Sequence, residues 1–278
     1  MIRLFAAALL AGLTSTAHAQ DAQQRIAWNR PFEPFRIVGD AHYVGTSGLS
    51  AFLVTGPQGH VLIDGGLPES APLIAANIRR LGFRLRDVKY ILINHAHYDH
   101  SGGLSELKRL TGAKLVASAG DRPDLEAGRT RNRPELDGFP SVKVDRVVRD
   151  GDVVRVGPIA LTAHLTPGHT RGATSWTTVS GGRRVIFATS LTVAGQTLTG
   201  DPLYPGAADD FRRTFATLKR MKADVFLNFH PEFFDRDRKR AAQIAGRADA
   251  FVDPGELHRQ VTTAEAGFEA EVKRQRRR

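Results

Sequence analysis

The sequence has no cysteine among its 278 residues. This absence excludes disulfides and thiolate metal ligands, so any bound metal must be held by His, Asp or Glu. Beyond the N-terminal segment, the chain also has no apolar run of the ~20 residues that span a bilayer. We therefore expect no stable membrane insertion.

Acidic residues are in the minority, with 29 Asp and Glu against 39 Lys and Arg and a formal net charge of +10. A positive surface can attract nucleic acid. However, the basic residues are scattered without interleaved aromatic residues, and part of the excess lies in residues 273–278. We expect no nucleic-acid partner. The 41% of hydrophobic residues is an ordinary globular proportion and argues against disorder.

The N-terminal residues have the order of a secretory signal peptide. Arg3 precedes a short apolar run that ends in Ala17-His18-Ala19, which predicts cleavage before Gln20. The alternative, a membrane anchor, is disfavoured because the run is too short. We expect a signal peptide over residues 1–19 and a single domain over residues 20–278, which we expect to be a monomer.

The hydrophobic pattern predicts two halves, each with strands followed by helices. The first half has strands at 42–46, 51–55, 60–64, 88–93 and 114–118 and helices at 72–81 and 103–110. The second has strands at 142–148, 160–165, 174–179, 184–188 and 224–228, a helix at 209–221 and helical C-terminal segments. Between them, the charged stretch 121–140 predicts a weak helix and then an exposed loop. This order predicts an α/β fold with sheets inside and helices outside.

Residues 95–100, His-Ala-His-Tyr-Asp-His, directly follow the predicted strand 88–93. In an extended backbone His95, His97 and Asp99 would project to one side and His100 elsewhere. The cluster is either a surface feature or part of a metal site. Because clustered imidazoles and a carboxylate are costly to bury unless paired or metal-bound, the metal site is favoured.

Two further histidines follow predicted strands, His169 after 160–165 and His230 after 224–228. Residues beyond the carboxyl ends of strands are where α/β folds place their ligands. Either histidine alone has a structural explanation, but the cluster requires partners. The remaining histidines of the predicted domain are assigned structural or surface roles: His42, His60, His164 and His258.

The HxHxDH pattern of residues 95–100, with His169 and His230, resembles the metallo-β-lactamase superfamily. The resemblance runs from about residue 31 to the C-terminus and implies an αββα four-layer sandwich. Within the superfamily the chain looks most like a subclass B3 metallo-β-lactamase, and the stretches that carry this likeness are 34–37, 43–46, 57–66, 165–170 and 190–192. The signal peptide then implies a periplasmic location.

The resemblance implies two Zn²⁺ ions. The first would be held by His95, His97 and His169, and the second by Asp99, His100 and His230. Three neutral nitrogens leave the first zinc able to lower the pKa of a bound water towards ~7. The implied activity is opening of the β-lactam ring of penicillins, cephalosporins and carbapenems by that hydroxide, with Asp99 as the catalytic residue that orients it.

Ser190 separates this hypothesis from related hydrolases. Glyoxalase-II-like enzymes, lactonases and nucleases of the superfamily place a metal-bridging Asp there, and other lactamase subclasses place a Cys. Ser190 and Thr192 are candidate substrate-binding hydroxyl donors, unless they merely line a turn. One departure is Thr189, where many B3 enzymes have Asp. Asp64 is a candidate acceptor for a ligand imidazole N–H, unless it is only a turn-forming Asp-Gly.

Two other functions remain open. One is another exported binuclear metal hydrolase of the same fold that acts on a lactone, thioester or phosphodiester. The other is a zinc-binding or partner-binding protein that retains the site without catalysis. Ser190 argues against most members of the first class, and the complete ligand set argues against the second.

Overall fold

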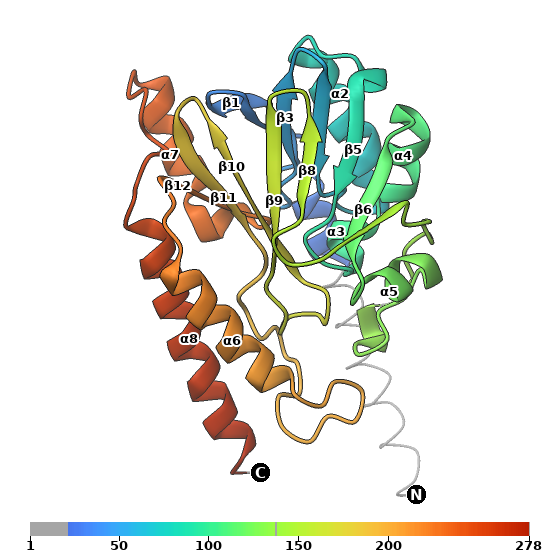
Figure 1. Cartoon of the computed structure of the whole chain (residues 1–278), viewed down its shortest axis with the longest axis vertical. Helices are drawn as coiled ribbons and strands as arrows, with labels where there is room; N and C mark the ends of the chain where they lie inside the picture. Colours follow the sequence, from blue (N-terminus) through green and yellow to red (C-terminus); the bar gives the residue numbers. More distant parts are fainter. Residues whose placement is uncertain (1–21, 137, 278) are drawn as a thin grey trace, which may run out of the picture.

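Two β-sheets face each other at the centre of the computed structural model, which describes residues 22–136 and 138–277 (Figure 1). The predicted signal peptide lies outside the described residues. The first sheet contains β1 (Phe35–Val38), β2 (Ala41–Tyr43), β3 (Phe52–Gly56), β4 (Gly59–Ile63), β5 (Val88–Leu92), β6 (Lys114–Ser118) and β7 (Arg146–Val148), in that order. The second has the order β12 (Val225–Asn228), β11 (Arg183–Ala188), β10 (Thr174–Ser180), β9 (Ile159–Leu165) and β8 (Val153–Val156).

Helices cover the outer sides of the sheets (Figure 1). On the first sheet lie α2 (Ala71–Arg80), α4 (Leu104–Thr111) and α5 (Arg122–Ala127), and on the second lie α6 (Ala207–Arg220), α7 (Arg236–Ile244) and α8 (Glu256–Gln275). The predicted αββα sandwich is confirmed. Gly112 ends α4 in the left-handed conformation, with φ +70°.

The sheet topology brings strand ends together at one edge. β4, β5, β6 and β7 run parallel to one another, and β11 runs parallel to β12. Because parallel strands end at the same edge, the turns after β4 and β5 emerge side by side. Trp176 of β10 joins the two sheets there, since its indole N–H donates to the carbonyl oxygen of Ile93 at 3.1 Å. The site is therefore built where strands from both halves end.

Two apolar cores hold these layers. Between the sheets pack large side chains such as Tyr43, Phe52 and Trp176, which are fully buried. Between the first sheet and its helices packs a smaller aliphatic core that includes Ile74 and Leu107. Burial of this kind contributes roughly 25 cal/mol per Å² of apolar surface.

Three features differ from the predicted pattern. β1 and β8 were not predicted, and the predicted strand 142–148 begins only at Arg146. The stretch 121–140 is less exposed than predicted, because Thr130 and Phe139 are buried. The hydroxyl of Thr130 donates to the carbonyl oxygen of Ala96, so this loop packs on the histidine turn instead of projecting into solvent.

Over residues 22–136 and 138–277, none of the helices combines the length and apolar character needed to cross a bilayer. The prediction of a single domain over residues 20–278 stays a prediction.

Candidate metal centre

The turn after β5 carries four of the six predicted ligands. His95 and His97 lie in irregular backbone, and the chain then forms the short helix α3 (Tyr98–Ser101). The expectation that Asp99 shares a side with His95 and His97 is therefore wrong, because it assumed an extended backbone. The helical turn instead places Asp99 in the same cluster as its neighbour His100.

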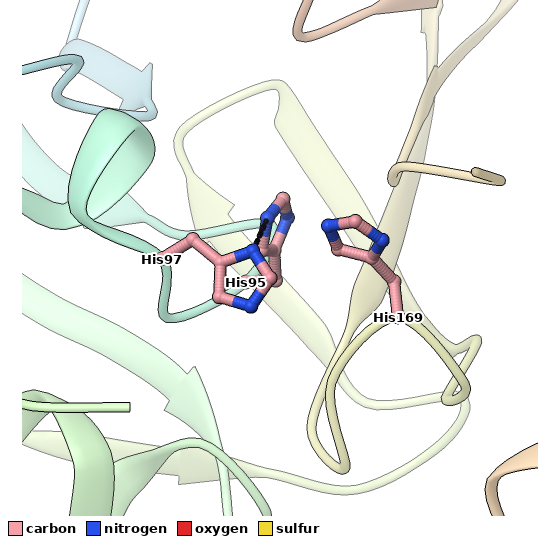
Figure 2. Close-up of side chains that lie close together, drawn as sticks. All are labelled: His95, His97 and His169. Atoms are coloured by element: carbon pink, nitrogen blue, oxygen red, sulfur yellow. Dashed lines mark hydrogen bonds between the residues drawn. The ribbon is translucent and has the colours of Figure 1, made fainter. Parts of the chain in front are cut away.

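Three imidazoles face one another in the first cluster (Figure 2). The ring centroids of His95, His97 and His169 lie 4.5–4.7 Å apart, and all three side chains are buried. His169 comes from the turn between β9 and β10. The preceding Gly168 has φ +136°, and a Cβ there would lie 2.7 Å from the Phe211 ring, so this turn requires glycine.

The second cluster joins the two halves of the chain. Oδ2 of Asp99 lies 3.3 Å from Nε2 of His100 and 3.4 Å from Nε2 of His230, which follows β12. In each cluster, one candidate ligand atom per residue lies within 4.8 Å of the others. All six predicted ligands are thus brought together in the two predicted groups.

The first cluster has the electrostatic properties of a metal site. Burial is the main cause that lowers the pKa of His95 and of His97 well below the ordinary value, and it lowers the pKa of His169 to about 4. The imidazoles are therefore neutral at neutral pH and offer lone pairs. Nε2 of His97 is buried and has no hydrogen-bond partner among the described residues, which is costly unless a cation takes its lone pair. Neutral buried nitrogens fit Zn²⁺.

The second cluster keeps a charged carboxylate. Burial alone would raise the pKa of Asp99, but the neighbouring His100 and His230 hold it well below the ordinary range. Burial alone would lower the pKa of His100, but Asp99 and Asp64 outweigh this and raise it to about 10. An ionised carboxylate with two imidazoles is a donor set that suits a second divalent cation.

Asp64 lies behind the second cluster, where its predicted role requires it to be. Its Oδ2 accepts a hydrogen bond from Nδ1 of His100 at 2.9 Å, and its Oδ1 accepts one from the backbone N–H of Asn94 at 3.0 Å. The amide of Asn94 also contacts both Asp64 and Nδ1 of His95. Asn94 therefore links the two clusters through Asp64 and His95, a role that the sequence pattern did not reveal.

Residues 189–192 form one wall of the site. The hydroxyls of Ser190 and Thr192 lie 3.0 Å apart and line the cleft above the clusters. The carbonyl oxygen of Thr192 accepts a hydrogen bond from Nδ1 of His169 at 2.7 Å. Thr189, the departure from the B3 pattern, donates to Oδ1 of Asn94 at 3.3 Å and so joins the same hydrogen-bond network.

The cleft that is lined by all of the candidate ligands except His95 has a volume of about 300 Å³. Among the lining residues that were not singled out from the sequence, Trp28 and Arg133 contact or influence the candidate ligands. Trp28 packs its ring 5.5 Å from that of His230, and Arg133 adds a positive charge that lowers the pKa of His97 and of His169. Neither residue stands in a pattern that would have marked it, because both reach the cleft from segments distant in sequence.

Asp121 is a third residue that the sequence did not single out. Its buried carboxylate accepts hydrogen bonds from the backbone N–H of Ala96 at 2.9 Å, the hydroxyl of Thr170 at 3.0 Å and the backbone N–H of Gly172 at 2.9 Å. Ala96 lies between two ligands of the first cluster, and Thr170 follows the third. Burial raises the pKa of Asp121 to about 7. One carboxylate thus ties together the two turns that form the first cluster.

Comparison with known proteins agrees with this geometry. A family model described as the metallo-β-lactamase superfamily matches residues 44–230, a span that includes all six candidate ligands. The chain belongs to the metallo-β-lactamase superfamily. A solved metallo-β-lactamase from Cronobacter sakazakii with a HARLDQ motif is 40% identical, with a TM-score of 0.89 over 92% of this chain and 100% of that one. Where that protein has HARLDQ, the chain described here has HAHYDH at residues 95–100.

A second solved structure connects the chain to subclass B3. BJP-1, a subclass B3 metallo-β-lactamase of Bradyrhizobium japonicum, is 44% identical, with a TM-score of 0.85 over 90% of this chain and 97% of that one. The predicted resemblance to subclass B3 is confirmed.

Curated relatives indicate a different activity over a shorter stretch. A hydroxyacylglutathione hydrolase of Rhodopseudomonas palustris is 39% identical over 103 residues, which are 37% of this chain and 32% of that protein. The metallo-β-lactamase superfamily member described here therefore spans about a third of the length of that relative.

Proposed function

We propose that the chain is a zinc-dependent hydrolase that opens the β-lactam ring of penicillins, cephalosporins and carbapenems. The observation that carries the proposal is the meeting of two ligand clusters in one cleft beside the hydroxyls of Ser190 and Thr192. The near-complete overlap with solved metallo-β-lactamases supports it. In the described residues, Asp99 is the one carboxylate of the two clusters, and a hydroxyl side chain, Ser190, occupies the position where thioester and lactone hydrolases carry Asp.

Two Zn²⁺ ions would be held by these clusters, the first by His95, His97 and His169. The second would be held by Asp99, His100 and His230. When bound, zinc lowers the pKa of a coordinated water to ≈ 7 and polarises a carbonyl group. Asp64, Asn94 and Asp121 then act as residues that orient the ligands.

Side chains of the cleft would orient the attacking water and bind the substrate. His100 and His230 hold the pKa of Asp99 low, so its carboxylate is ionised. An ionised carboxylate can orient the attacking water as a hydrogen-bond acceptor and receive its proton. The hydroxyls of Ser190 and Thr192 donate to the carboxylate that β-lactams carry. The guanidinium of Arg133 adds positive charge at the same cleft and favours an anionic substrate.

A second candidate function is thioester hydrolysis. The partial similarity to hydroxyacylglutathione hydrolases is the observation that favours it. Both reactions need a water nucleophile and a stabilised oxyanion, so the geometry of the clusters alone does not separate them.

The deciding experiment uses purified protein that starts at Gln20. Hydrolysis of a chromogenic cephalosporin, a carbapenem and a lactoylglutathione thioester is measured with bound metal quantified, after chelation and after zinc is restored. Zinc-dependent turnover of both β-lactams is expected. Turnover of the thioester alone would replace the proposal with the second candidate, and two bound zincs without any turnover would contradict both.

The location and physiological role form part of the proposal. The predicted signal peptide supports export to the periplasm, where β-lactams meet their targets. Expression of the full chain in a bacterial host is expected to place activity in the periplasmic fraction and to raise the inhibitory concentration of a carbapenem. Activity confined to the cytoplasmic fraction would contradict export.

A further inference from the structure

A second cavity, of about 530 Å³, adjoins the metal cleft and is larger than the cleft itself. It lies between α8 and the residues that follow β11 and β12. The two spaces share two lining residues, Thr192 and Phe233, so the cavity is continuous with the wall of the cleft. Its volume falls within the range of pockets that bury small-molecule ligands.

The lining of this cavity is chemically unlike that of the cleft. Its walls are mainly apolar and include Leu191, Phe226 and Phe268. Of the described residues that line it, only Glu271 and Arg274 are charged, and these two side chains pair with each other. An uncharged apolar group therefore fits the interior better than a charged one.

Gly267 lies at the exposed rim of the cavity, on the side of α8. A Cβ added there would meet no atom within 4 Å, so the space that a side chain would fill is left free. Glycine inside a helix is unfavourable relative to alanine, and here it leaves room for an occupant.

The walls of the cavity also carry the supports of two candidate ligands. The carbonyl oxygen of Thr192 accepts the hydrogen bond from His169. The side-chain oxygen of Asn228 accepts one from the backbone N–H of His230 at 3.1 Å. A group that occupies the cavity therefore packs against the residues that position the candidate metal site, at the end of the cleft where Ser190 and Thr192 lie.

We propose that this cavity receives an uncharged aryl or alkyl substituent of the substrate whose reacting bond lies in the metal cleft. This inference rests on the proposed function and names the class of β-lactam that the enzyme prefers. An apolar side chain would enter beside Thr192 and Phe233 while the ring and its carboxylate stay beside the metal clusters.

The test compares two substrates that differ by one apolar group, benzylpenicillin and 6-aminopenicillanic acid. Gly267→Leu fills the cavity and is expected to lower kcat/KM about tenfold for benzylpenicillin, as expected for loss of a buried ring, and less than about twofold for 6-aminopenicillanic acid. The matched control is Ala266→Leu, which adds a side chain at an exposed neighbouring position outside the cavity. Equal effects on both substrates, or none, would overturn the proposal.

A binding measurement keeps this test separate from the proposed function. The neutral fluorescent probe N-phenyl-1-naphthylamine is titrated into zinc-loaded protein and then displaced with benzylpenicillin. Gly267→Leu is expected to weaken probe binding about tenfold, whereas Ala266→Leu leaves it unchanged. If neither penicillin is hydrolysed, the proposed function fails, but displacement of the probe by benzylpenicillin still supports the cavity as the site for its ring. Probe binding that benzylpenicillin does not displace would overturn the inference.

A second pair of variants covers the case in which Gly267→Leu does not fold. Thr263→Leu fills the cavity from the preceding turn of α8, and Thr262→Leu is its exposed control outside the cavity. Thr263→Leu is expected to lower kcat/KM more for benzylpenicillin than for 6-aminopenicillanic acid. Thr262→Leu is expected to show no such difference.

Discussion

The two halves of the chain hold their candidate ligands in different ways. The first half supplies four of them from one turn, and buried carboxylates, Asp64 and Asp121, lie behind that turn. The second half supplies His169 and His230 singly, each supported by neutral groups, the carbonyl oxygen of Thr192 and the side chain of Asn228. Carboxyl groups thus support the turn of the first half, whereas neutral groups contact the imidazole of His169 and the backbone of His230. Asp121 also binds the turn that carries His169, through Thr170 and Gly172.

The largest expected effect comes from removing a ligand of the second half. His169→Ala should lose the metal of the first cluster and lower kcat by about 10³-fold or more, because metal chemistry supplies several kcal/mol of transition-state stabilisation. Zinc content and kcat measure this. His164→Ala is the matched control, since His164 lies near the end of β9 and contacts Thr177, outside both clusters. Full activity of His169→Ala would refute its assignment as a ligand.

The next effect tests the charged ligand of the first half. Asp99→Asn should lower kcat by about 10²–10⁴-fold, because the neutral amide cannot accept the proton of the attacking water. One zinc should remain bound, since the three histidines of the first cluster are untouched. Metal analysis after gel filtration, together with kcat, checks both parts. Unchanged turnover would remove Asp99 from its catalytic role.

Two further variants separate the carboxylates that support the first half. Asp121→Asn should weaken metal binding at the first cluster by about 10–100-fold, and Asp64→Asn should do the same at the second. Asn suits the backbone at position 64, where φ is +70°. Stepwise Co²⁺ titration followed by absorption spectroscopy reports each site separately. The same loss at both sites in either variant would contradict this division.

The smallest expected effect concerns β11 and β12, the parallel strand pair that precedes His230. Asp224 accepts hydrogen bonds from the side chain and backbone of Arg184 at the start of β11, and these lower its pKa to about 2. The pKa of Asp224 in the folded state is below its ordinary value of 3.8, so its contribution to stability is present above about pH 4 and is lost as the pH falls towards 2.

Because the Arg184 side chain of this ion pair is exposed, Asp224→Asn should lower the urea midpoint at pH 7 by roughly 0.3 M or less. Wild type and variant should converge at pH 2. Urea unfolding curves at pH 7, 4 and 2 measure the difference, and a gap that widens on acidification would show that the sign is wrong.

The difference between local and long-range contacts also explains which site residues could be predicted from the sequence. Histidines are few, and each of the ligand positions follows a strand, so all six candidate ligands were found from local pattern. The direction of the Asp99 side chain was not predicted, because it depends on the helical turn α3. Asp121 was missed because its partners lie 25 to 51 residues away, and nothing in its neighbourhood marks a carboxylate that binds backbone N–H groups.

The fold followed from alternating strands and helices, whereas two of its short strands were not predicted. β1 and β8 have four residues each, too few to show a clear period, and they form by pairing with neighbouring strands. The loop 121–140 looked exposed because of its charge. Its burial comes from single contacts such as Thr130 with Ala96, which local composition does not encode.

The hydrogen bond from His169 to Thr192 fixes more than a ring orientation. A carbonyl oxygen can only accept, so Nδ1 of His169 must carry the hydrogen, and the same holds for His100 against the carboxylate of Asp64. Both rings are thereby locked in a form in which Nδ1 is protonated and Nε2 is the atom left to face the cleft. An arriving metal finds the tautomer of His169 already chosen, whereas His100, whose pKa Asp99 and Asp64 raise to about 10, must first give up the proton on Nε2.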